Sequence, residues 1–136
     1  MYELCLLQDI LRFFSSGGTG KTYLLSLLLS KIRQGGHIAL AAAASGVAAQ
    51  LLPGGRTAHA TFKLPFDLSK DDTPTCNITK RSSKAKVLQK TSLIVWDECS
   101  MVHKSHLEAV DRTLRDILDK DEPMGGLTLV LAGDFR

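Results

Sequence analysis

The sequence predicts an α/β fold in which a parallel sheet is flanked by helices. Two apolar runs, residues 92–97 (SLIVWD) and 127–134 (LTLVLAGD), are continuous rather than alternating, which is typical of strands buried on both faces. Buried strands that alternate with helices form parallel sheets, and residues 103–120 between the two runs predict an amphipathic helix. Its apolar stripe consists of Leu107, Val110, Leu114, Ile117 and Leu118.

The composition is ordinary for a soluble globular domain, with 44% hydrophobic and 23% charged residues. A chain of 136 residues is long enough to bury one core, and its net charge of +3 permits a nucleic-acid partner without requiring one. No apolar run approaches the ~20 residues that cross a bilayer, and the N-terminus lacks the basic region of a signal peptide. The cysteines form neither a zinc pattern nor a disulfide framework, which favours a reducing compartment.

The first part of the chain contains the elements around a glycine-rich turn. Residues 4–14 are apolar without a clean period, so a helix and a strand both remain open there. Residues 21–34 predict a helix because they are rich in leucine and lack glycine and proline, and Gly35 and Gly36 are expected to end it. Residues 37–44 are a short apolar strand candidate, although alanine is a poor strand former.

The middle of the chain is expected to be less regular. Residues 46–52 predict a short helix that stops at the Pro-Gly-Gly sequence of residues 53–55. Residues 65–83 are rich in proline, aspartate, serine and threonine and have no period, which predicts a surface loop. A basic cluster lies near this loop, and a solvated charged face explains it at least as well as phosphate contacts do. Its members are Lys80, Arg81, Lys84, Lys86 and Lys90.

The turn before the first predicted helix matches the core of the phosphate-binding pattern G-x-x-x-x-G-K-[ST]. Glycines allow successive backbone N–H groups to point at phosphate oxygens, and the helix N-terminus that follows favours anions. Lys21 supplies a positive charge for the β- and γ-phosphates of a nucleotide, and the Thr22 hydroxyl is a ligand for Mg²⁺. The predicted nucleotide-binding residues are Gly17, Gly18, Thr19, Gly20, Lys21 and Thr22.

Two features of this turn leave another interpretation open. Ser15 stands where the pattern has its first glycine, and the strand expected before the turn is poorly formed. The alternative is a glycine-rich turn that only caps an ordinary helix. A second part of the same site is needed to decide between the two.

Asp97 and Glu98 provide that second part, because they stand where the buried run of residues 92–97 ends. Ligands of open α/β sheets bind beyond the carboxyl ends of the strands. Asp97 is predicted to hold the Mg²⁺ that Thr22 also contacts, and Glu98 to orient and deprotonate the attacking water. The alternative is a strand that ends in solvated acids, a common arrangement.

Three further segments resemble those of Pif-type helicases, the petite-integration-frequency family of superfamily-one DNA helicases, which includes helicases carried by Helitron-like transposons. They are ASGVAAQLLPGGRTAHATFKLP, SLIVWDECSMVHKSHLEAVDRTLRDI and GGLTLVLAGDFR. With the glycine-rich turn they follow the family's order from about Phe13 to Arg136. The resemblance implies a RecA-like core, ATP and Mg²⁺, and 5′-to-3′ movement along single-stranded DNA, with duplex junctions as further partners. It also implies roles in telomere maintenance, replication, recombination and repair, in the nucleus or the mitochondrion.

The resemblance also assigns contacts with DNA. It implies that Ser45 and Gly46 contact the DNA backbone, and that Thr57, His59 and Phe62 belong to the next strand-contacting motif. A hydroxyl or a histidine can bond a phosphate, and an aromatic ring can stack on a base. The alternatives are a satisfied polar residue for His59 and a place in the core for Phe62, and the core is favoured for Phe62.

The same resemblance limits what the chain is expected to do. It implies that Lys21 and Glu98 are the catalytic residues and that Asp134 lies near the nucleotide at the end of its strand. Residues 1–136 would form one partial RecA-like ATPase domain, the first motor domain, with the second motor domain and its arginine fingers absent. Since one arginine finger contributes ~10³–10⁵ to the rate, the chain is expected to bind nucleotide weakly and neither to hydrolyse ATP usefully nor to unwind DNA.

Two other functions remain open. One is a different P-loop enzyme, such as a nucleotide kinase or a chaperone-like ATPase, although the arginine-rich lid of a kinase is not visible. The other is an inactive remnant or incomplete product of a transposon helicase, which Ser15 and the end of the sequence at Arg136 favour. No membrane partner is expected, and the sequence does not predict the oligomeric state.

Overall fold

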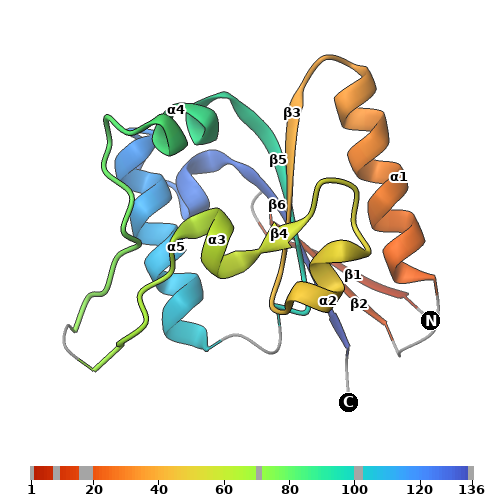
Figure 1. Cartoon of the computed structure of the whole chain (residues 1–136), viewed down its shortest axis with the longest axis horizontal. Coiled ribbons are helices and arrows are strands. Elements are labelled where there is room, and N and C mark those ends of the chain that lie inside the picture. The colour runs from red at the N-terminus through yellow and green to blue at the C-terminus, as the bar shows by residue number, and fades with distance from the viewer. Residues whose placement is uncertain (1, 8–9, 16–19, 70–71, 100–102, 135–136) are drawn as a thin grey trace.

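The main feature of the fold is one six-stranded sheet with the strand order β1-β2-β6-β5-β3-β4 (Figure 1). Five neighbouring strands, from β2 to β4 in this order, are parallel, whereas β1 pairs antiparallel with β2. The predicted parallel α/β sheet is therefore confirmed, with an antiparallel strand added at one edge. The computed structural model describes residues 2–7, 10–15, 20–69, 72–99 and 103–134.

The elements follow one another as strands and short helices. The strands are β1 (Tyr2–Leu7), β2 (Ile10–Ser15), β3 (Ile38–Ala43), β4 (Arg56–Thr57), β5 (Thr91–Asp97) and β6 (Thr128–Asp134). The helices are α1 (Lys21–Gln34), α2 (Gly46–Gln50), α3 (Ala58–Phe62), α4 (Ser83–Lys90) and α5 (Lys104–Ile117), with the 3-10 turn η2 (Pro123–Gly126). None of the helices in the described part of the chain has the length and apolar character needed to span a membrane.

Most elements lie where the sequence predicts them. Helix α1 has the predicted bounds, and β5 begins one residue before the predicted run. The ambiguous residues 4–14 form parts of β1 and β2, so a strand does lead up to the glycine-rich turn. The short helices α3 and α4 were not predicted, because their few apolar positions show no helical period in the sequence.

Helices cover both faces of the sheet, with α1 on one face and α3, α4 and α5 on the other (Figure 1). Successive residues of β5 face opposite sides. Leu93 and Val95 pack in the cluster with Leu25 of α1, whereas Ile94 and Trp96 pack in the cluster that contains the apolar stripe of α5. Both faces are buried, which is why this strand is apolar without alternation.

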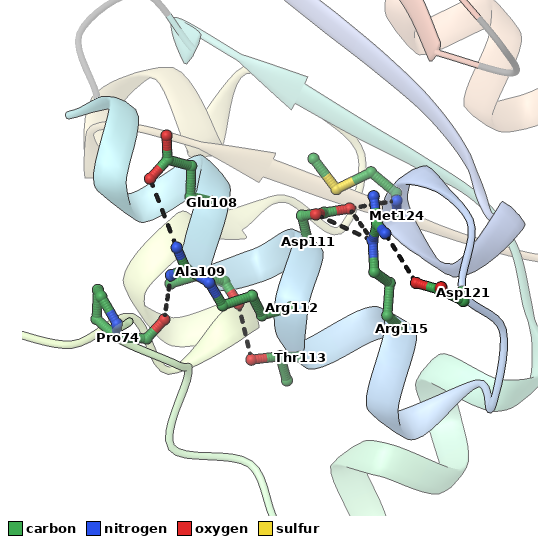
Figure 2. A network of polar contacts seen from close by, with 9 residues as sticks. All are labelled: Pro74, Glu108, Ala109, Asp111, Arg112, Thr113, Arg115, Asp121 and Met124. Atoms are coloured by element: carbon green, nitrogen blue, oxygen red, sulfur yellow. Dashed lines mark hydrogen bonds and ion pairs between the residues drawn. The ribbon is translucent and has the colours of Figure 1, made fainter. Parts of the chain in front are cut away.

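Polar contacts attach the predicted loop of residues 65–83 to α5 (Figure 2). Arg112 Nη1 donates to the Pro74 carbonyl at 2.9 Å, and the Cys76 N–H donates to Thr113 Oγ1 at 2.9 Å. Pro74 and Cys76 are buried. The loop therefore lacks regular structure up to the start of α4 among its described residues, but part of it belongs to the core rather than to the surface.

Candidate nucleotide-binding site

The start of α1 depends on a glycine in the left-handed conformation. Gly20 has φ 80° and ψ 16°, which glycine adopts without the steric cost that a Cβ brings. Its carbonyl accepts a hydrogen bond from Leu24 N–H at 3.2 Å, so the helix begins directly after it. The first turn carries no acidic side chain, and a helix start of this kind favours anions. Gly17, Gly18 and Thr19 lie outside the described residues.

Lys21 and Asp97 meet at the carboxyl edge of the sheet. Lys21 is the first residue of α1 and Asp97 the last residue of β5, and Lys21 Nζ lies 3.6 Å from Asp97 Oδ1. Their side chains are 12% and 6% exposed, so the attraction is screened less than between surface charges. Asp97 is therefore buried, unlike the solvated acid that the alternative interpretation places at the end of this strand.

Glu98 changes the direction of the chain immediately after β5. Its φ of 56° lies in the left-handed region, which is uncommon for a residue with a side chain. The Glu98 N–H donates to Asp97 Oδ1 at 2.8 Å. Glu98 Oε2 accepts a hydrogen bond from Ser45 Oγ at 3.2 Å, which joins the predicted acidic pair to the start of α2.

The ends of three neighbouring strands carry the acidic pair and two of the predicted DNA contacts. Asp97 lies opposite Ala43 in the sheet, and Ala43 lies opposite Thr57. Thr57 Oγ1 caps α3 by accepting from Ala60 N–H at 3.1 Å. Ser45, just beyond β3, caps α2 in the same way through Ala48 N–H at 3.2 Å. The hydroxyls of Ser45 and Thr57 therefore belong to the same edge of the sheet as Asp97.

The other three predicted DNA contacts differ from one another. Gly46 is the first residue of α2, and a Cβ added there would meet open space. His59 is exposed and stacks on Phe66, with the ring centroids 5.7 Å apart. Phe62 is 1% exposed and packs against Trp96 with centroids 4.9 Å apart. A ring buried in this way cannot stack on a base. Phe62 therefore belongs to the core, which is the alternative that the sequence favoured for it.

Phe66 is an aromatic residue that the sequence reasoning missed. It is 94% exposed and lies against the ring of His59. His106 lies edge-on to His59 at 5.5 Å, and its Nε2 forms a 3.1 Å hydrogen bond with the carbonyl of Pro65. The available signal was an aromatic residue within a segment otherwise rich in proline and polar residues, directly after the strand-contacting motif.

Asp134 is the last residue of β6, which lies between β2 and β5. It is opposite Ser15 at the end of β2, the residue that stands in place of the first glycine of the phosphate-binding pattern. Three adjacent parallel strands therefore end in the glycine-rich turn, in Asp134 and in Asp97. This is the edge at which open α/β sheets bind ligands.

The oxygen donors of the site suit a hard divalent cation. Thr22, the half-buried second residue of α1, has a hydroxyl group, and Asp97 has a carboxylate. Among the described residues no group of three or more His, Cys, Asp or Glu side chains could hold a metal ion. Mg²⁺ commonly binds through one or two carboxylates together with water and substrate phosphates, so these two residues fit that ion when it arrives with a nucleotide.

Comparison with known proteins shows which family and which relatives this chain resembles. A family model described as PIF1-like helicase matches residues 7–136. The chain is similar to the ATP-dependent DNA helicase Pif1 of Psychrobacter sp. (strain PRwf-1), with 30% identity over 120 residues and 88% of the chain. It is also similar to the ATP-dependent DNA helicase PIF1 of Homo sapiens, with 31% identity over 126 residues and 90% of the chain. The chain spans 18% and 19% of the lengths of these two relatives.

Solved structures agree with this comparison. Bacteroides Pif1 bound to single-stranded DNA matches with a TM-score of 0.71 and 36% identity over 89% of the chain. Pif1 helicase from Candida albicans matches with a TM-score of 0.75 and 26% identity over 90% of the chain. The chain covers 27% and 28% of these two structures. The Bacteroides helicase in complex with ADP-AlF3 and single-stranded DNA also matches, with a TM-score of 0.71. The fold is therefore the RecA-like fold of these helicases, and the chain corresponds to a part of that fold.

Proposed function

Since this chain belongs to the PIF1-like helicase family, we propose that it is the nucleotide-binding part of an ATP-dependent DNA helicase. The observation that carries the proposal is the 3.6 Å approach of Lys21 Nζ to Asp97 Oδ1. This contact joins the residue after the glycine-rich turn to the acid at the end of β5. A turn that only caps a helix has no need of such a partner. No particular contact among the described residues favours a nucleotide kinase or a chaperone-like ATPase.

Each residue of the proposed site has one chemical role. Bound Mg²⁺ would offset negative charge on the phosphates of ATP. Thr22 and Asp97 would hold that ion, and the ammonium group of Lys21 would bind phosphate oxygens. Gly17 to Gly20 and Asp134 would line the nucleotide. Glu98 would orient the attacking water and accept its proton, with its carboxylate held by Ser45 Oγ at 3.2 Å.

Single-stranded DNA is the polymer that we propose for the same edge of the sheet. Solved relatives are described with single-stranded DNA and at forked double-stranded DNA. Ser45, Gly46, Thr57 and His59 would contact the strand in this chain, and duplex junctions would be a further partner. Ser45 also donates a hydrogen bond to Glu98, the proposed general base. A DNA strand that bound Ser45 would therefore change a contact that positions the Glu98 carboxylate. Movement in the 5′-to-3′ direction, roles in telomere maintenance, recombination and repair, and a nuclear or mitochondrial location rest on the family alone.

Nucleotide binding by matched lysine variants tests the proposal. Titration of Mg²⁺–ATP should give an affinity at least about tenfold weaker for Lys21→Ala than for the wild type, because a charge-assisted contact is lost. Lys31→Ala is the control, because Lys31 is an exposed lysine in the last turn of the same helix. Circular dichroism should show the same helix content in all three proteins. Equal affinity for ATP in the wild type and Lys21→Ala would refute the proposed site.

A further inference from the structure

A cavity of about 220 Å³ lies at the β3–β4 edge of the sheet. None of the described residues proposed for nucleotide or DNA lines it. Its polar wall is formed by Arg33 at the end of α1, Arg56 of β4, Thr61 of α3 and Lys84 of α4. Its apolar wall includes Leu40 of β3 and Val87 of α4.

The cavity exists because β4 is only two residues long. Arg56 and Thr57 pair with Ala42 and Ala43, and β4 has no residues to pair with the earlier part of β3. Arg33 covers part of that open edge by donating from Nε at 3.1 Å and from Nη2 at 2.8 Å to the Ala39 carbonyl. Its Nη1 donates to the Pro53 carbonyl at 2.8 Å. The guanidinium group is thereby fixed in the wall of the cavity.

The three cations of the cavity have no acidic partner among the described residues. Arg33 bonds only backbone carbonyls, and Lys84 Nζ donates to the carbonyls of Ala60 and Thr61 at 2.7 and 3.1 Å. Burial lowers the pKa of Lys84, and the nearby charges of Arg56 and Lys63 lower it further. Guanidinium and ammonium groups carry five and three N–H donors, so donors remain for a ligand.

Thr61 is a second, independent indication of a ligand. The residue is 7% exposed and lines the cavity. Its Oγ1 has no hydrogen-bond partner in the described part of the chain. Buried hydroxyl groups are normally paired, since an unpaired one loses its bonds to water without replacement. Because Oγ1 is itself buried, an acceptor bound in the cavity would satisfy it after the Thr61 side chain turned toward the cavity.

We propose that this cavity binds a phosphate group carried on a small apolar or aromatic body. A phosphate dianion matches a set of three cations better than a single carboxylate does, and arginine suits phosphate geometry. Thr61 would turn its side chain and donate its O–H to the same group. The aliphatic side chains of Leu40 and Val87 would pack against the organic body.

Phenyl phosphate is the probe for an NMR titration of the ¹⁵N-labelled chain. Amide signals of Gly54, Arg56 and Thr61 should shift and saturate in the wild type, and equally in Lys21→Ala, where the proposed nucleotide site is disabled. Arg56→Gln and Thr61→Val should each weaken binding, the former by about tenfold or more. Arg81→Gln removes an exposed positive charge elsewhere and should leave binding unchanged.

Three outcomes would overturn the proposal. One is the absence of saturation at these three amides. Another is a response confined to residues 20–22 that disappears in Lys21→Ala, because phenyl phosphate would then occupy only the proposed nucleotide site. The third is a shift of the same amide signals by a thymidine oligonucleotide without terminal phosphates at a lower concentration than phenyl phosphate needs, since the cavity would then bind DNA.

Discussion

Glu98 joins the proposed chemistry to the proposed DNA contact. Its left-handed backbone, with φ 56°, is of a kind that concentrates at functional sites and costs of order 1–3 kcal/mol. The side chain bonds Ser45, which in turn caps α2. Ser45 therefore has two partners, a carboxylate and a backbone N–H. Thr57, the other helix-capping residue at this edge, has only the backbone partner Ala60 within the described part of the chain.

The bond between Ser45 and Glu98 should be measurable as a coupling energy. In a double-mutant cycle of Ser45→Ala and Glu98→Ala, the free energies of unfolding by urea should deviate from additivity by about 0.5–1.5 kcal/mol. The cycle of Thr57→Ala with Glu98→Ala is the control and should be additive within about 0.5 kcal/mol. Additivity in both cycles would mean that the Ser45 contact contributes nothing.

Cys76 should make the chain less stable in alkaline solution. Burial raises the pKa of its thiol from 9.0 to about 11, against a smaller opposing effect of Thr113. Below pH 9 the thiol is protonated in both states, and its contribution to stability is fully present. Between about pH 9 and 11 the unfolded chain loses the proton first, so the free energy of unfolding should fall by about 2–3 kcal/mol.

The comparison with Cys76→Ala isolates this effect, because lysines and tyrosines also titrate in that range. Urea unfolding between pH 8 and 11.5 should show a shallower loss of stability in Cys76→Ala than in the wild type. Parallel curves for the two proteins would exclude the thiol as the cause.

Helix α5 is the element that holds the irregular segments in place (Figure 2). One part of it binds the backbone of the 65–83 segment through Arg112 and Thr113. Another binds the turn η2, where Asp111 Oδ1 accepts from Met124 N–H at 2.7 Å. Arg115 bonds both Asp111 of the helix and Asp121, which precedes the turn η2. The amphipathic pattern predicted the buried stripe of the helix, but not these contacts of its polar side.

Any side chain at Gly125 should destabilise the turn η2. The φ of Gly125 is 65°, and an added Cβ would lie 2.6 Å from the Leu114 carbonyl oxygen and 2.8 Å from Leu118 Cδ1. Gly125→Ala should therefore lower the free energy of unfolding by about 2–5 kcal/mol, from backbone strain and overpacking together. Gly36→Ala is the matched control, because its φ is 82° and nothing lies within 4 Å.

Gly36→Ala should cost only the strain, about 1–2 kcal/mol. The difference between the two variants in urea or thermal unfolding reports the clash with Leu114 and Leu118. Equal losses of stability would show that η2 shifts to make room for the methyl group.

The sheet topology brings the proposed site together in the molecule as a whole. The order β2-β6-β5 places the glycine-rich turn, Asp134 and Asp97 at the ends of three adjacent parallel strands. Helix α1 crosses one face of the sheet between β2 and β3, while the later helices cover the other face. Ligand sites of open α/β sheets form where the strand order reverses in this way.

The 136-residue chain, tested by itself, should bind Mg²⁺–ATP without becoming a motor. It spans only 18% of the Psychrobacter relative, and one arginine finger supplied from elsewhere contributes ~10³–10⁵ to phosphoryl transfer. A coupled ATPase assay with and without single-stranded DNA should show negligible turnover in both cases. DNA-stimulated turnover at the ~1–10³ s⁻¹ typical of enzymes would contradict this expectation.

The sequence by itself determined the elements whose signals are local. The bounds of α1, the buried strands β5 and β6 and the stripe of α5 follow from propensity and periodicity within windows of a few turns. Lys21, Thr22, Asp97 and Glu98 could be selected because phosphate and metal chemistry requires those residue types at the ends of such elements.

Only the tertiary structure decided how these parts meet. Residues 4–14 contribute to two strands because β1 pairs with β2 and β2 pairs with β6, and Phe62 is buried against Trp96. The bond from Ser45 to Glu98 joins residues 53 positions apart, and the β4-edge cavity combines side chains from five segments. Contacts of this kind depend on how segments that are far apart in the sequence pack together. A local pattern in one segment does not specify which distant segment it will contact.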